Sequence, residues 1–213
     1  MKKNLSLFLM IISASILAQS SVEKIFAFDH FLHYEKETKK GIEDKIIFVN
    51  SQNPKYQMVV MMVDGQYFGD LVSFDDGRSY FFKVQKRAKT ASDFTYFGAN
   101  ELENIINKKY SRRVEEYHRF ITIDERNLEL KFYRDRKMKK EICTHHLHIS
   151  KSDFSLFYAY KGAFLSFLED ESELSNQDDL MVTKSEVKSG TESFKISLKD
   201  FQKVNFEIKI PAN

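Results

Sequence analysis

Histidines gathered in the second half of the chain are the feature most suggestive of metal chemistry. On a β-strand, His146 and His148 share one face, whereas His145 shares the other face with Cys143. Two imidazoles on one face could bind Zn²⁺ or Cu²⁺, but such a site needs a third or fourth ligand, at least one of them from elsewhere in the chain. No known ligand spacing is completed here. His146 and His148 are therefore weak metal candidates, and the preferred interpretation places them on a solvated face beside Thr144.

A second pair of histidines lies near two carboxylates. His30 and His33 would share a face on a helix and lie on opposite faces on a strand, and Asp29 and Glu35 stand beside them. General acid–base catalysis would need a cleft and a shifted pKa, which a sequence cannot show. We interpret these residues as ordinary surface or half-buried polar groups.

Motifs for nucleophilic or cofactor chemistry are missing from the sequence. The chain has no Gly-x-Ser-x-Gly elbow and no Gly-rich phosphate loop. Ser185 and Lys188 match Ser-x-x-Lys, but so short a match arises by chance and falls in a predicted strand. Cys143 is the only cysteine, so no intramolecular disulfide can form, and we interpret it as a buried, inert thiol. The sequence predicts no catalytic residues and no cofactor, and it favours a protein that is not an enzyme.

Two runs of like charge are candidate binding surfaces. The basic run could bind anionic head groups or a partner, or it could form a solvated hairpin tip. Its members are Arg126, Lys131, Arg134, Arg136, Lys137, Lys139 and Lys140. The acidic run is predicted to form a loop that complements the basic run or binds Ca²⁺ weakly, without the register of a calcium loop. Its members are Glu169, Asp170, Glu171, Glu173, Asp178 and Asp179.

The N-terminus predicts export. Two lysines follow the initial Met, and the apolar run Leu5–Leu17 comes next, which is shorter than the roughly 20 residues needed to span a bilayer. Ala18 and Ser20 are small residues at the positions that a cleavage site of the A-x-A type requires, and a cut after Ala18 is the alternative. We predict a signal peptide over 1–20 and a single β-rich domain over 21–213. A buried N-terminal helix or a retained membrane anchor are the less favoured interpretations.

Composition limits the class of partner. Without the two leader lysines, the 33 basic residues become 31 and equal the 31 acidic ones. A neutral chain lacks the electrostatic footprint of a nucleic-acid-binding protein. The 20 Phe and 10 Tyr residues argue against disorder and suit β-structure. No later run is long and apolar enough for a membrane helix.

The clearest structural signal is an antiparallel meander between residues 45 and 85. Strands are predicted at Lys45–Val49, Tyr56–Val63, Gln66–Phe74 and Ser79–Gln85. The Asp-Gly pair at 64–65 predicts a two-residue type I′ hairpin, because that turn needs positive φ. The run Tyr56–Val63 is apolar on both faces, so we expect a central strand that is covered on both sides.

Other segments extend the same pattern. Further strands are predicted at Phe26–Lys36, Phe94–Phe97, Tyr117–Ile123, Leu128–Tyr133, Glu141–Ile149, Leu180–Val187, Ser193–Leu198 and Val204–Ile210. The first of these also fits a helical stripe. A capping box at Asn100 predicts a short helix that ends near Lys109, residues 88–93 look like a linker, and 154–168 is ambiguous with a break at Gly162.

The fold class that these elements define is mainly β. We predict one antiparallel β-domain of about ten strands, as an open barrel, a curved sheet or a sandwich, with one or two short helices. By fold alone, such a domain resembles the open-barrel lipid and lipoprotein carriers of bacterial envelopes. This resemblance implies a carrier function, and because one fold serves many functions, the function has to be argued from the site.

Our leading hypothesis is an exported, non-enzymatic binding protein of the periplasm or the extracellular space. Its partner would be an apolar ligand such as a lipid, or another envelope protein. The Met- and aromatic-rich segments Met58–Met62 and Tyr80–Phe82 motivate this hypothesis, although they could equally fill the core. A surface interaction module is the second hypothesis and a hydrolase the third. A deep apolar cavity would favour the carrier, an exposed aromatic patch the module, and a cleft with His and carboxylates the enzyme.

Overall fold

The structure is a computed structural model, and it describes residues 23–86, 92–103, 117–154, 156–165 and 179–211. Several predictions lie outside these residues. They are the signal peptide over 1–20, the linker over 88–91, the helix over 104–109 and most of the acidic run. They stay predictions.

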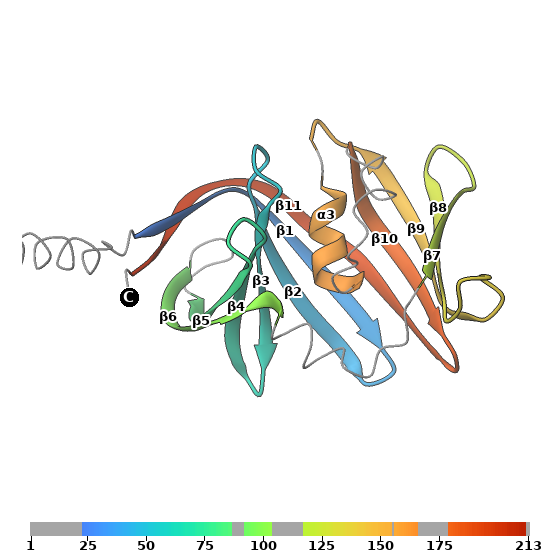
Figure 1. Cartoon of the computed structure of the whole chain (residues 1–213), viewed down its shortest axis with the longest axis horizontal. Helices are drawn as coiled ribbons and strands as arrows, with labels where there is room; N and C mark the ends of the chain where they lie inside the picture. Colours follow the sequence, from blue (N-terminus) through green and yellow to red (C-terminus); the bar gives the residue numbers. More distant parts are fainter. Residues whose placement is uncertain (1–22, 87–91, 104–116, 155, 166–178, 212–213) are drawn as a thin grey trace, which may run out of the picture. The chain divides into compact units, whose positions relative to one another are not determined.

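The chain forms one antiparallel sheet of eleven strands, in the order β6-β5-β4-β3-β2-β1-β11-β10-β9-β8-β7 (Figure 1). The predicted mainly β class is confirmed. The strands are β1 (Lys24–Thr38), β2 (Gly41–Val49), β3 (Tyr56–Val63), β4 (Gln66–Ser73), β5 (Arg78–Lys86), β6 (Ser92–Glu101), β7 (Tyr117–Thr122), β8 (Asn127–Tyr133), β9 (Glu141–Lys151), β10 (Leu180–Ser189) and β11 (Glu192–Ile210). The sheet is open, because β6 and β7 are its end strands. No helix among the described residues is long and apolar enough to cross a membrane.

The meander is confirmed and continues from β2 through β6. Asp64 and Gly65 have φ values of 50° and 78°, as the type I′ turn between β3 and β4 requires. The predicted helix begins slightly later than expected, because Asn100 and Glu101 end β6 and the first helical residues are Leu102 and Glu103. The bulge between Phe81 and Phe82 is an irregularity that the sequence does not announce.

Two other predictions need correction. Residues 193–198 and 204–210 belong to one strand, β11, because the backbone stays extended through residues 199–203. β3 is covered on both sides only as far as Val60, since Met62 is 53% and Val63 46% exposed. Beyond Val60 the strand runs into its hairpin.

Residues 154–168, for which the sequence predicts no definite structure, contain one helical segment. It consists of α3 (Phe157–Tyr160) and the π-helical turn η1 (Lys161–Leu165). The predicted break at Gly162 is wrong, because this glycine lies inside η1. A Cβ atom at Gly162 would overlap the side-chain amide of Gln57 on β3. The glycine therefore permits close packing of the helical segment on the sheet.

Contacts divide the chain into two compact units. The smaller unit holds the chain ends, and its described residues are 23–27 and 207–211. Within it the Lys209 ammonium lies 4.0 Å from the Glu23 carboxylate. The larger unit is 28–206 and holds all the features described below. The single domain predicted over 21–213 stays a prediction.

The larger unit has two hydrophobic clusters. At the centre of the sheet they lie on opposite faces, because Leu32 pairs with Ile47 across β1 and β2 while the neighbouring Phe31 pairs with Phe48. Leu32 and Ile47 belong to the cluster that α3 covers. Phe48 belongs to the other cluster, which we call the aromatic core. Its rings are those of Phe28, Phe48, Phe82, Phe94 and Phe206.

The aromatic core joins strands that are far apart in the sheet order. The ring of Phe206 on β11 stacks on that of Phe94 on β6, with centroids 5.7 Å apart. β6 and β11 stand six places apart in the sheet order. The sheet from β6 to β11 therefore curls far enough to bring its two ends together over one face.

Candidate functional site

The face that α3 and η1 cover is the best candidate site, and we call it the covered face. Figure 1 shows the helical segment lying against the sheet. Buried apolar residues from seven strands line this face. They are Leu32, Tyr34, Ile47, Val49, Val59, Leu128, Leu130, Phe132, Leu147, Ile149, Val182, Val187 and Ile196. The cover contributes Phe157, Ala159, Tyr160, Ala163 and Leu165 to the same cluster. An apolar surface of the sheet is thus closed by one short segment.

Tyr34, at the centre of this face, contacts both a neighbouring strand and the cover. Its hydroxyl donates a 2.7 Å hydrogen bond to the carbonyl of Val182 on β10. Its ring meets the ring of Phe164 edge-on at 5.4 Å and that of Tyr160 at 6.2 Å. Burial, and secondly the charge of Tyr160, raise the pKa of the Tyr34 hydroxyl far above its ordinary value. Tyr34 is therefore a neutral, structural donor.

A buried histidine lies beneath the cover. His145 on β9 is hydrogen-bonded through Nδ1 to the Tyr160 hydroxyl at 3.1 Å. Burial lowers the pKa of His145 to about 4, with a smaller contribution from His146. Burial also raises the pKa of Tyr160, and the nearby Ser185 hydroxyl offsets part of that rise. At neutral pH both partners are uncharged.

Lys45 on β2 holds the end of the cover. Its ammonium donates a 2.5 Å hydrogen bond to the carbonyl of Ala163 in η1. The same ammonium lies 4.7 Å from the centroid of the Phe164 ring. Carbonyls at the end of a helical segment carry partial negative charge, and an aromatic face attracts cations. Lys45 therefore binds both an oxygen and an aromatic ring of the chain itself.

Two polar atoms beneath the cover lack partners. The Gln57 Oε1 and Ser185 Oγ atoms are buried, and neither makes a hydrogen bond of acceptable geometry. Although Ser185 affects the pKa of Tyr160, the approach of the two hydroxyls is not a well-formed hydrogen bond. A buried polar atom without a partner costs about 1–3 kcal/mol. A closed state in which these two atoms stay unpaired would carry this penalty.

The structure separates the predicted histidine candidates by side of β9. His145 lies inward, as its place on the Cys143 side predicts. His146 and His148 lie on the outer side, half-buried. The His146 Nδ1 atom lies 3.1 Å from the Glu129 carboxylate, and the His148 Nδ1 atom donates to the Arg126 carbonyl at 2.9 Å.

Thr144, which we predicted on a solvated face beside these histidines, is a correction. Thr144 is buried, because its hydroxyl donates to the Glu141 carboxylate at 2.5 Å and its strand is paired on both sides. Within the described ranges, no three His, Cys, Asp or Glu side chains gather closely enough to hold a metal ion. The metal candidacy of His146 and His148 stays a weak prediction.

The carboxylate of Asp29 brings His30 and Ser51 together, but not in the order of a serine hydrolase. Asp29 accepts hydrogen bonds from His30 Nδ1 at 2.8 Å and from the Ser51 hydroxyl at 2.5 Å. Burial raises the pKa of Asp29, but these bonds outweigh burial and hold that pKa below its ordinary value. An activated nucleophile needs a hydroxyl bonded to the base. Here the Ser51 hydroxyl donates to the Asp29 carboxylate, and His30 is bonded to that same carboxylate.

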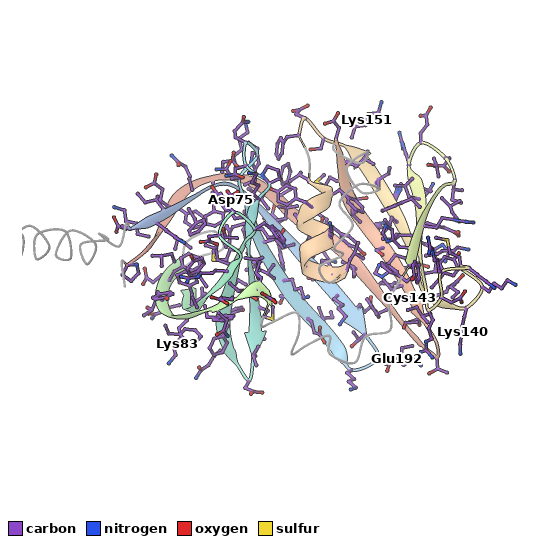
Figure 2. The ribbon with its side chains drawn as sticks, in the orientation of Figure 1. Asp75, Lys83, Lys140, Cys143, Lys151 and Glu192 are labelled. Atoms are coloured by element: carbon purple, nitrogen blue, oxygen red, sulfur yellow. The ribbon has the colours of Figure 1, made fainter. Side chains whose placement is uncertain are left out.

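The basic run does not form one patch. Arg126 precedes β8, Lys131 lies within it, and Arg134–Lys140 form the turn that follows it, so the run is distributed along the whole strand and the turn after it. Lys140 lies at the edge of the molecule (Figure 2). The Lys140 amide donates to the Asp135 carboxylate at 3.0 Å. This is the solvated hairpin tip that the sequence allows.

Surface hollows and patches give weaker candidates. A pocket of about 340 Å³ opens between hairpin ends, and its rim includes Lys39, Glu186, Lys188 and Lys195. Because its rim is charged, this pocket is not the deep apolar cavity that we expected of a carrier.

An aromatic patch lies on β4, β5 and β6. Phe97 is 55% exposed, and its ring centroid lies 6.4 Å from that of Phe68 and 6.1 Å from that of Phe81. By contrast, Met58, Tyr80 and Phe82 are fully buried and fill the core.

Comparisons with known proteins add a likeness in structure only. No protein family and no curated protein matches the sequence. One similar crystal structure is a domain from Vibrio parahaemolyticus provisionally described as an outer membrane lipoprotein-sorting protein domain. It has a TM-score of 0.31 and 8% identity, and the match covers 83% of this chain and 85% of that chain.

A second is a β-barrel-like protein of the domain of unknown function DUF1849 from Brucella abortus. Its TM-score is 0.31 and its identity 7%, with 85% of this chain and 100% of that chain covered. At these values neither likeness indicates what the chain binds.

Proposed function

We propose that the chain is an exported, non-enzymatic binding protein that carries an apolar ligand, such as a lipid, on the covered face. The leader-like N-terminus supports action in the periplasm or outside the cell. The apolar lining of the covered face supports the class of ligand. The described part of its cover, four residues of α3 and five of η1, is short, which supports access.

The observation that carries this proposal is the pair of unsatisfied polar atoms beneath the cover. A core that never opens tends to satisfy its buried polar groups. Gln57 Oε1 and Ser185 Oγ are left without partners when the cover is in place. Opening the cover would let water or a ligand reach them, which lowers the free-energy difference between the closed and the open face.

The ligand would take the place of the cover's aromatic side chains. Phe157, Tyr160 and Phe164 occupy the face as an acyl chain or another apolar group could. Each Å² of apolar surface that the ligand removes from water contributes about 25 cal/mol. The observed affinity is reduced by the fraction of molecules in which the cover is open.

A reversible disulfide across the cover tests the proposal. Gln57→Cys with Gly162→Cys, in a Cys143→Ser background, places two cysteines where a Gly162 Cβ would meet the Gln57 side chain. The ligand is pyrenedecanol, a neutral fluorescent amphiphile. We expect it to bind the reduced variant and the wild type, and to bind the oxidised variant at least tenfold more weakly.

The reduced form of the same variant is the matched control, because it differs from the oxidised form by one bond. Equal binding by the oxidised and reduced forms would place the ligand elsewhere. Absence of binding to the wild type would exclude an apolar carrier of this kind.

The surface interaction module remains the second candidate, and the aromatic patch of Phe68, Phe81 and Phe97 favours it. A protein partner on this patch would bind equally to the oxidised and reduced variants. Phe97→Ser would weaken such a partner and leave pyrenedecanol binding unchanged. The two candidates are therefore separated by the same set of proteins.

A further inference from the structure

We infer that the ligand of the covered face carries a neutral hydrogen-bond donor, an O–H or N–H group, which binds the side-chain oxygen of Gln57. This inference rests on the proposed function and specifies the class of its ligand. It goes beyond an apolar ligand in general, because a hydrocarbon, an ether and an ionised acid all lack the donor that this oxygen needs.

Gln57 is a polar residue in an apolar part of the covered face, and it is only 3% exposed. It pairs with Val49 on β2 and with Val72 on β4, and Val59 follows on the same face of β3. All three valines are buried. An amide buried among apolar side chains costs free energy unless it is hydrogen-bonded, whereas an apolar residue would fill the same space without that cost.

The amide of Gln57 faces the cover. A Cβ atom at Gly162 in η1 would lie 3.1 Å from the Gln57 Oε1 atom and would overlap the rest of the amide. Among the described residues, this Oε1 atom has no hydrogen-bond donor. Because η1 lies directly against the amide, a ligand that replaces η1 on the face meets the unpaired oxygen.

The chemistry of this oxygen determines the class of ligand. An amide oxygen only accepts hydrogen bonds, so its partner must donate one. An ionised acid would place oxygen against oxygen, and an ammonium group would bring a charge among buried valines at a high cost in desolvation. A hydroxyl or an amide N–H attached to an apolar chain meets both conditions. Ser185, the other unpaired group, can donate as well as accept, so it does not discriminate between these ligands.

The test compares two probes with the same tail, pyrenedecanol and its methyl ether, which keeps the oxygen but has no donor. Wild type should bind the alcohol at least about fivefold more tightly, because the ether leaves the buried oxygen of Gln57 unpaired. An apolar surface without an acceptor would favour the ether, since the alcohol loses more hydrogen bonds to water on burial. A preference for the alcohol therefore indicates an acceptor in the site.

Two variants remove the acceptor, Gln57→Leu at similar volume and Gln57→Met at similar length. Both should lose the preference for the alcohol and should bind the ether at least as tightly as wild type does, which also verifies that the face is intact. Gln66→Leu is the matched control, because Gln66 is exposed on the neighbouring β4. This control and Ser185→Ala should keep the preference. Circular dichroism of each variant verifies that it is folded.

The outcomes separate the inference from the proposed function. Equal or tighter binding of the ether by wild type, or an unchanged preference in both Gln57 variants, would overturn the inference and leave the apolar carrier standing. Failure of both probes to bind wild type would overturn the proposed function itself. Loss of the preference in the Gln57 variants, together with its retention in Gln66→Leu and Ser185→Ala, supports the assignment of Gln57.

Discussion

The aromatic core and the covered face bury side chains of similar size, but they differ in the polar groups that they bury. The aromatic core is made of Phe rings that contact each other at 4.9–6.4 Å, as in Phe48 with Phe206 and Phe82 with Phe94. The covered face contains His145 and the unsatisfied atoms of Gln57 and Ser185. A region that stays closed can be made of carbon alone, whereas a region that opens needs a closed state that is not too stable.

The two regions also differ in how they are closed. Phe206 and Phe94 come from strands of the same sheet, so the aromatic core opens only if the sheet uncurls. The covered face is closed by α3 and η1, which belong to no strand, so their departure would not require any described strand pairing to break. We therefore expect most of the global stability to reside in the aromatic core, and the local opening to occur at the cover.

The largest expected effect is the removal of a ring from the aromatic core. Phe48→Ala should lower the free energy of unfolding by about 3–5 kcal/mol, because it leaves a cavity among closely packed rings. Phe164→Ala should cost less than half as much, since that ring is only half-buried and lies on the cover. Urea denaturation of both variants measures the difference. Equal losses would show that the cover is as integral to the fold as the aromatic core.

The next effect is acid sensitivity of the covered face. The pKa of His145 is lowered to about 4 by burial, whereas an unfolded histidine titrates near 6.5. The unfolded state therefore takes up a proton first, so stability is complete above pH 6.5 and is lost as the pH falls toward 4. The loss should reach roughly 3 kcal/mol.

Urea midpoints at several pH values measure this effect. His145→Gln should lack this part of the pH dependence. His146→Gln, one residue along and on the outer side of β9, should retain it. A pH dependence that persists in His145→Gln would assign the acid sensitivity to another group.

A smaller effect concerns the fit of the cover on β3. In an ordinary helical position, Gly→Ala stabilises by about 1 kcal/mol. At Gly162 the new Cβ would overlap the Gln57 amide, so Gly162→Ala should instead destabilise by about 1–3 kcal/mol. Adding Gln57→Ala should recover part of the loss, which a double-mutant cycle of denaturation midpoints would reveal. A stabilised Gly162→Ala would mean that the Gln57 side chain yields freely.

The sheet could be predicted because its signals are local. Alternation of Leu128, Leu130 and Phe132 with polar residues predicts β8, and all three are buried. The Asp-Gly turn at 64–65 predicts the β3–β4 hairpin through backbone sterics alone. The full extent of β11 cannot be predicted in this way, because residues 199–203 show no clear apolar alternation and include Asp200, a residue type common in turns.

The covered face could not be predicted, because its members are distant in sequence. Lys45 meets Ala163 across more than a hundred residues, and no periodicity links them. Gly162 looks like a helix breaker until Gln57 is placed against it. The alternation of β9 predicts that His145 faces inward, but its partner Tyr160 lies in a segment whose structure the sequence does not predict. The contacts of the covered face depend on how elements distant in sequence pack together, which local sequence patterns do not show.

The smallest expected effect lies on the outer side of β9, where the same strand presents His146 and His148. Their partners are the Glu129 carboxylate and the Arg126 carbonyl, and both histidines are half-buried. His146→Ala with His148→Ala should change the free energy of unfolding by less than about 0.5 kcal/mol, as surface substitutions usually do. Added Zn²⁺ should leave the melting temperature of the wild type unchanged. If the two imidazoles did bind Zn²⁺, mass action would stabilise the wild type by about 2.7 kcal/mol at a hundred times the dissociation constant. Thermal melts of both proteins, with Zn²⁺ and with chelator, distinguish these cases, and a rise confined to the wild type would turn the outer side of β9 into a metal site.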